Sequence, residues 1–62
     1  MTWREHRTRV ETNALRLERA RELLDKAHLQ LVLLGDAMAA YRVKRIIISV
    51  ETERQRWLST ID

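Results

Sequence analysis

Apolar residues recur every seven positions along the first two thirds of the chain. The positions are Trp3, Val10, Leu17, Leu24, Leu31 and Met38, and three residues after them come His6, Asn13, Ala20, Ala27, Leu34 and Tyr41. This alternation of three and four residues places the side chains in one stripe along an α-helix, as in a coiled coil. Thr2 and Glu5 have the spacing of a capping box, which starts a helix. The pattern therefore predicts a helix over about residues 3–34.

The seven-residue stripe ends after Tyr41, where polar residues take the next positions. A second stripe in a different register follows, made of Ala40, Val43, Ile47, Val50, Trp57 and Ile61 and interrupted by Arg54. Gly35, the only glycine, lies just before this change and can adopt the left-handed conformation that ends a helix. Asp36 can cap the helix that comes next. We therefore predict a turn at 35–36 and a second helix over about residues 37–60.

Two other structures are compatible with parts of this pattern. Because the first stripe continues to Tyr41, Gly35 can also lie inside a single helix of about 90 Å, at about 1.5 Å per residue. The segment YRVKRIIISVE is rich in β-branched residues, which favour strands. As a strand it would expose some of its three successive isoleucines, and the segment that follows is helical in character. We therefore expect a single all-α domain, a two-helix antiparallel hairpin.

Such a hairpin places residue i roughly level with residue 71 − i, so that Leu24 lies level with Ile47. Several apolar residues fall outside the stripe between the helices: Leu15, Leu23, Leu29, Val32, Leu33, Ile46 and Ile48. A hairpin cannot bury them by itself, and a contiguous exposed apolar surface marks an interface. We therefore predict a symmetric dimer of hairpins, a four-helix bundle. A larger assembly, or a groove for a different protein, is also compatible with these residues. The predicted interface comprises Leu17, Leu24, Leu31, Ile46, Ile47, Val50 and Trp57.

Length and composition point the same way. A domain of 62 residues buries only about 60% of the surface of its unfolded chain, so its core needs reinforcement. The chain has no cysteine, which excludes disulfides and thiolate metal sites. His6 and His28 lack a metal-ligand spacing, and no catalytic pattern of nucleophile or paired carboxylates is present. We expect no cofactor, no metal and no enzymatic activity, which leaves oligomerisation as the source of stability.

The sequence does not favour a membrane protein. The aliphatic run Leu29–Leu34 is compatible with a face on a membrane surface, but it lacks the one-sided polarity of such helices, which favours the core of a bundle. The N-terminal segment MTWREHRTRVET is too charged for a secretory signal. The longest nearly uncharged run, Ala27–Tyr41, is only about 15 residues long, which is too short to span a bilayer. We therefore expect a cytoplasmic protein.

Charged residues suggest local pairs and one basic cluster. Opposite charges stand four residues apart in the pairs Glu5/Arg9, Arg7/Glu11, Arg21/Asp25 and Glu22/Lys26. The net charge is +3, and the clearest basic cluster is Arg42, Lys44 and Arg45. This cluster either contacts phosphates or forms a solvated face beside the turn. The hairpin places Arg54 level with Glu18, so we expect an ion pair between them.

Two functions fit these features. The first is a small interaction module that self-associates and binds a protein partner through helix-in-groove or helix-on-helix contacts, as an adaptor, inhibitor or assembly factor. The second is a dimeric regulator that binds RNA or DNA through arginine-rich helix faces, using Arg42, Lys44 and Arg45 together with the arginines of the first helix, such as Arg4, Arg7 and Arg9. Steeply salt-dependent binding of nucleic acid would distinguish the second function from the first.

Overall fold

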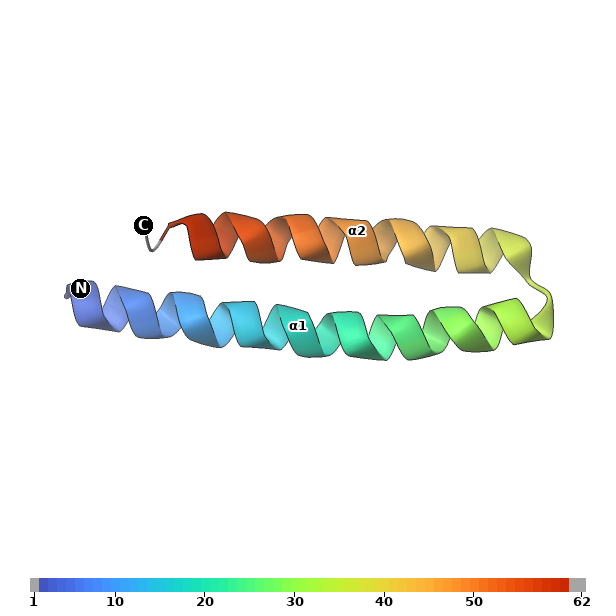
Figure 1. Cartoon of the computed structure of the whole chain (residues 1–62), viewed down its shortest axis with the longest axis horizontal. Coiled ribbons are helices and arrows are strands. Elements are labelled where there is room, and N and C mark those ends of the chain that lie inside the picture. The colour runs from blue at the N-terminus through green and yellow to red at the C-terminus, as the bar shows by residue number, and fades with distance from the viewer. Residues whose placement is uncertain (1, 61–62) are drawn as a thin grey trace.

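The computed structural model describes residues 2–60 and contains two helices that lie side by side in opposite directions (Figure 1). Helix α1 runs over Trp3–Leu34 and helix α2 over Ala37–Ser59. The hairpin is 49 Å long and 14 Å across, and the start of α1 and the end of α2 both lie at the end opposite the turn. The segment YRVKRIIISVE lies inside α2, and residues 2–60 contain no strand. The all-helical class is therefore confirmed.

Helix α1 begins at the predicted capping box. The backbone N–H of Thr2 donates to Glu5 Oε2 at 3.1 Å, and the backbone N–H of Glu5 donates to Thr2 Oγ1 at 3.2 Å. The first N–H groups of a helix have no partner inside the helix, so these reciprocal bonds satisfy groups that would otherwise be left to water. The sequence signal and the local structure agree at this end of the molecule.

The turn between the helices depends on Gly35 and Asp36. Gly35 has φ 87° and ψ 13°, and its N–H donates to the carbonyls of Leu31 and Val32 at 3.1 and 3.0 Å. The N–H of Asp36 donates to the carbonyl of Leu31 at 3.0 Å. These bonds form a Schellman motif, which ends α1 and satisfies the carbonyls of Leu31 and Val32 in its last turn. Asp36 Oδ1 then accepts the N–H of Ala39 at 3.0 Å and caps α2.

Replacement of this glycine should destabilise the hairpin. In Gly35→Ala we expect the free energy of unfolding to fall by about 1–2 kcal/mol, because an L-residue resists the left-handed conformation. The new methyl group would meet no heavy atom within 4 Å, so the cost is conformational rather than steric. Gly35→Asn should lose less, because asparagine tolerates this region. Urea unfolding measures both changes. An alanine variant as stable as the original chain would contradict the turn.

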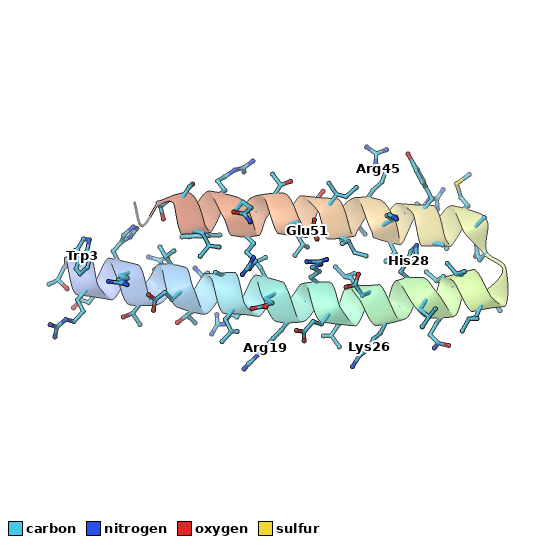
Figure 2. The ribbon with its side chains drawn as sticks, viewed as in Figure 1. Trp3, Arg19, Lys26, His28, Arg45 and Glu51 are labelled. Atoms are coloured by element: carbon cyan, nitrogen blue, oxygen red, sulfur yellow. The ribbon has the colours of Figure 1, made fainter. Side chains whose placement is uncertain are left out.

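The face of α1 that contacts α2 departs from the strict seven-residue pattern. Leu24, His28 and Leu31 are partly buried there, whereas Ala27, which the pattern places in the stripe, is exposed. Figure 2 shows His28 between the two helices. The contact lies one residue later than predicted, at His28 instead of Ala27, and the same shift is present earlier in α1, where Ala14 is more buried than Asn13. Leu34 is exposed as well.

Helix α2 presents the predicted second stripe to α1. Ala40 is buried, and Val43, Ile47, Val50, Arg54 and Trp57 are partly buried. Ile61 lies outside the described residues. An ion pair of 2.9 Å between Arg21 on α1 and Glu51 on α2 shows which residues of the two helices are level with each other. The predicted pairing places Arg21 level with position 50, so it is correct to within one residue.

Candidate interaction surface

The contact between the two helices buries very few side chains. Among the described residues, only Val10, Ala14 and Ala40 are buried. The other residues of the contact are partly exposed, because each helix has a single neighbour to cover it. Most of the stability of helices in proteins comes from packing of an apolar face, so a core of this size supports the hairpin only weakly.

Large apolar side chains are instead exposed on both helices. The eleven among the described residues are Trp3, Leu15, Leu23, Leu29, Val32, Leu33, Leu34, Met38, Tyr41, Ile46 and Ile48, with exposed fractions from 47% to 76%. Nine of the eleven lie between Leu23 and Ile48. We call residues 23–48, which include the turn, the apolar half of the hairpin, and residues 2–22 with 49–60 the charged half.

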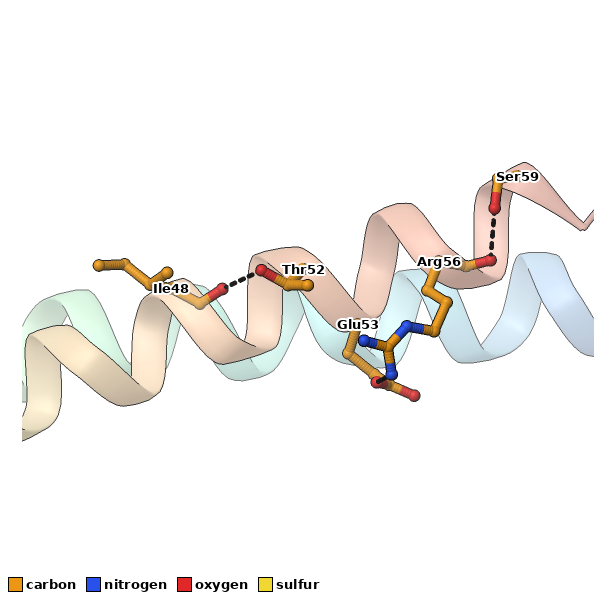
Figure 3. A network of polar contacts seen from close by, with 5 residues as sticks. All are labelled: Ile48, Thr52, Glu53, Arg56 and Ser59. Atoms are coloured by element: carbon orange, nitrogen blue, oxygen red, sulfur yellow. Dashed lines mark hydrogen bonds and ion pairs between the residues drawn. The ribbon is translucent and has the colours of Figure 1, made fainter.

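Polar groups of the charged half bond mainly within their own helix. In α2 the Thr52 hydroxyl donates to the carbonyl of Ile48 at 3.0 Å, and Ser59 donates to the carbonyl of Arg56 at 2.8 Å (Figure 3). Arg56 and Glu53 form an ion pair of 3.2 Å one turn apart. The polar groups of these residues are satisfied without a partner molecule. Since the charged half also carries only two of the eleven exposed large apolar side chains, it offers less to drive association than the apolar half.

Most of the predicted interface residues lie in the contact between α1 and α2. These are Leu17, Leu24, Leu31, Ile47, Val50 and Trp57, all partly buried. Ile46 differs, since it is 50% exposed. The apolar residues beside the stripe, such as Leu29 and Ile48, are more exposed and more accessible to another molecule. The sequence pattern missed Leu34, Met38 and Tyr41 as surface residues, because it assigned them to the stripe of the first helix.

One side of the hairpin can be traced from the Arg21–Glu51 ion pair, which joins the helices there. Each residue turns a helix by about 100°, so side chains three, four, seven or eight positions apart return to nearly the same side. On α1 we count forward from Arg21 by four, eight and eleven positions. On α2 we count back from Glu51 by three, seven and ten positions. These residues are Asp25, Leu29, Val32, Ile48, Lys44 and Tyr41, and we call this the Tyr41 side. A shallow apolar depression near the turn supports the assignment, because Val32 and Tyr41 both line it.

The opposite side follows from the same geometry. Residues two apart on a helix point about 200° apart, because each residue turns the helix by about 100°. Leu23 therefore faces away from Arg21, and Ile46 faces away from Ile48. Leu23, Ala27, Leu34, Arg42 and Ile46 form what we call the Ile46 side. All five are exposed.

Arg54 lies where the stripe predicts, but without its expected partner. Arg54 and Glu18 line the same groove between the helices, yet no ion pair joins them. The Nε atom of Arg54 is buried and has no hydrogen-bond partner. A buried donor without a partner lowers stability, since it has lost its water without replacement. The expected pair is therefore wrong, although the predicted position is right.

Removal of this donor should be tolerated. We expect Arg54→Leu to keep its helical content and to gain up to about 1 kcal/mol in free energy of unfolding, because leucine fills the stripe without an unpaired group. Arg56→Leu is the matched control: Arg56 is 71% exposed, so stability should change by less than about 0.5 kcal/mol. Circular dichroism during urea unfolding measures both. Loss of helix in Arg54→Leu would show that the arginine stabilises the hairpin.

The three basic residues beside the turn point in different directions. Arg42, Lys44 and Arg45 are all exposed, and none makes an ion pair within residues 2–60. Lys44 belongs to the Tyr41 side and Arg42 to the Ile46 side. Figure 2 shows Arg45 on the outer side of α2, away from α1. The three cations therefore form no single face of high charge.

The two tryptophans have different surroundings. Trp3, at the start of α1, is 67% exposed, and the guanidinium of Arg7 lies 5.4 Å from the centre of its ring (Figure 2). This distance fits a cation–π contact. Trp57 is partly buried on the face of α2 toward α1. Trp3 is therefore the more accessible of the two to another molecule.

Within residues 2–60, no three His, Cys, Asp or Glu side chains gather closely enough to hold a metal ion. Neither of the two helices has the length and apolar character that crossing a membrane requires. Comparison of the chain with protein-family models, curated proteins and solved structures finds no match.

Proposed function

We propose that this chain is a non-enzymatic helical interaction module, which self-associates as a dimeric four-helix bundle and binds a protein partner. The observation that supports this most strongly is the ratio of exposed to buried apolar side chains. Eleven large apolar side chains are exposed in the described part of the chain, while only three residues are buried. Burial of apolar surface contributes about 25 cal/mol per Å², so covering these side chains is favourable.

The surface area of the chain agrees with self-association. The hairpin exposes 5158 Å², whereas a compact protein of 7.4 kDa exposes about 4200 Å². The difference of about 950 Å² is close to the roughly 800 Å² that each partner contributes to a standard protein interface. Association along the length of the hairpin would therefore bring its exposed surface near that of a compact protein.

Partner binding calls for a second surface, and the hairpin has two apolar sides. A dimer that covers one side leaves the other open for helix-on-helix contact with a different protein. Leu23 is 67% exposed in the apolar half. Arg16 is exposed on the same side of α1, seven residues earlier in the charged half. These two positions test which half the partner contacts.

The test is affinity capture from the native cell extract with three forms of the chain. The original chain and Arg16→Glu should retain the same protein, and Leu23→Glu should lose it, because a carboxylate disrupts an apolar contact. Direct titration of that protein, once purified, should then give binding to the first two forms only. A protein retained equally by all three forms would contradict binding through the apolar half.

Binding of nucleic acid is the second candidate function. The observation in its favour is that Arg42, Lys44 and Arg45 are exposed and make no ion pair within residues 2–60. Filter binding of RNA and DNA at two salt concentrations tests it. Affinity that falls steeply with salt would support a nucleic-acid-binding regulator, because phosphate contacts release counterions. The absence of binding at low salt would remove this candidate.

A further inference from the structure

We propose that the second copy of the chain packs on the Tyr41 side with both turns at the same end of the dimer. In this arrangement the twofold axis runs along the hairpin, so α1 of each copy lies over α2 of the other. The inference rests on the self-association proposed above and adds the surface and the orientation. Two independent features of the hairpin support it: where the apolar side chains lie and how the charges are placed.

The position of the apolar half favours turns at the same end. Nine of the eleven exposed large apolar side chains lie in residues 23–48. With the turns together, the apolar halves of the two copies cover each other along the whole half. With the turns at opposite ends and full overlap, each apolar half would instead face the charged half of its partner. That arrangement would leave apolar side chains against charged groups, which must then lose water without a matching partner.

Charges on the Tyr41 side favour the same orientation. Asp25 on α1 and Lys44 on α2 are exposed charges of opposite sign within the apolar half. Since Arg21 is level with Glu51, Asp25 is level with position 47 of α2. Lys44 is three residues away from that position, which corresponds to about 4.5 Å along the helix axis. A twofold axis along the hairpin places Asp25 of each copy near Lys44 of the other, which forms two unlike pairs. A twofold axis perpendicular to the helices, at the level of Asp25 and Lys44, would instead place α1 of one copy over α1 of the other. Asp25 would then lie near the second Asp25, and Lys44 near the second Lys44.

Charges at a second position along the hairpin, the Arg21–Glu51 pair, fit the same twofold axis. Arg21 and Glu51 already pair within one copy at 2.9 Å, and both remain about half exposed. With α1 over α2 of the other copy, the two pairs form a ring of four alternating charges. Complementary charges of this kind fix the orientation of an interface more than they add to its affinity. They therefore act together with the apolar contact of Leu29, Val32, Tyr41 and Ile48.

The charges also select the Tyr41 side over the Ile46 side. On the Ile46 side, Arg42 is level with position 30, which is a glutamine. The residues of α1 on that side in the apolar half are Leu23, Ala27 and Leu34, so none is acidic. A second copy on this side would cover Arg42 without an opposite charge, which is unfavourable. The Ile46 side therefore remains open for the protein partner.

A matched pair of variants tests the surface. Ile48 and Ile46 are 55% and 50% exposed, two residues apart and on opposite sides. We expect Ile48→Glu to raise the dimer dissociation constant by about 100-fold or more, since it places two carboxylates in the interface, and Ile46→Glu to change it by less than about threefold. Sedimentation velocity measures both, with helical content checked by circular dichroism. Dissociation by Ile46→Glu would overturn the choice of side.

Charge reversal and a distance measurement test the orientation. Lys44→Asp should weaken the dimer by about tenfold, and addition of Asp25→Lys should restore it. A spin label on Leu33→Cys, near the turn, should report a distance of about 20–30 Å between the copies, since packed helices lie about 10 Å apart. A distance close to the 49 Å length of the hairpin, in a protein that is still dimeric, would overturn the orientation alone. A monomeric original chain would overturn self-association as well.

Discussion

Ala40→Glu should leave the chain mostly unfolded under conditions in which the original chain is helical. Ala40 is only 5% exposed and lies where α2 approaches α1, one turn after the helix begins. A glutamate there would force the helices apart and bury a carboxylate without a partner. The expected loss is more than about 3 kcal/mol. The core of a domain of this size rarely supplies more than about 3–5 kcal/mol, so such a loss removes most of the stability.

Ala27→Glu is the control for this variant. Ala27 is exposed on α1 within the apolar half, although the seven-residue pattern would place it in the core. We expect its stability to change by less than about 0.5 kcal/mol, and its helical content to stay the same. Circular dichroism at equal concentrations compares the two. A folded Ala40→Glu together with an unfolded Ala27→Glu would mean that the seven-residue pattern, and not the structure described here, gives the correct contact face.

Thermal unfolding should depend on protein concentration. If the folded form is a dimer, mass action stabilises it as the concentration rises. Each tenfold increase contributes about 1.4 kcal/mol per dimer, which corresponds to a rise in Tm of about 5 °C for a protein of this size. Circular dichroism over a hundredfold range of concentration measures the shift. We expect this dependence because the core of one hairpin is small: only three of the described residues are buried in it.

The Ile48→Glu variant supplies the control for this dependence. If it is monomeric, as expected, its Tm should be lower than that of the original chain and independent of concentration. Ile46→Glu should keep the dependence, because Ile46 lies on the opposite side of α2. A constant Tm for the original chain over the whole range would mean that one hairpin is stable alone.

The helices and the turn were predictable from the sequence because their signals are local. Thr2 and Glu5 are three residues apart, and the hydrogen bonds they make depend on nothing outside the first turn. The turn is likewise local. Gly35 adopts a left-handed backbone because it has no side chain, and the Asp36 carboxylate caps α2 by accepting the N–H of Ala39. The change of stripe register beyond the glycine was the only long-range signal needed to decide between a hairpin and a single helix.

The contact face of α1 was only partly predictable. The first position of the seven-residue repeat stays in the contact from Val10 to Leu31. At the position three residues later the contact falls one residue further on, since Ala14 and His28 are more buried than Asn13 and Ala27. Tyr41 continues the pattern in sequence, yet it belongs to α2 and is 59% exposed. This exposed tyrosine is central to the proposed dimer surface.

Individual ion pairs were predicted with mixed success. Arg7–Glu11 and Arg21–Asp25 are present at 3.0 and 3.8 Å. Within residues 2–60, the predicted pairs Glu5–Arg9 and Glu22–Lys26 are absent. The Glu5 carboxylate instead accepts the N–H of Thr2 in the capping box. Spacing shows which side chains can meet, but it does not show which of several partners a long side chain takes. Exposed pairs contribute only about 0–1 kcal/mol, so these choices have little effect on the fold.

The central claim is that the hairpin associates with a second copy through its exposed apolar side chains. Sedimentation equilibrium of the original chain at micromolar concentration, with circular dichroism on the same sample, tests it most directly. We predict a helical species with twice the 7.4 kDa mass of the chain. A fully helical and stable species of 7.4 kDa over the whole concentration range would contradict the claim.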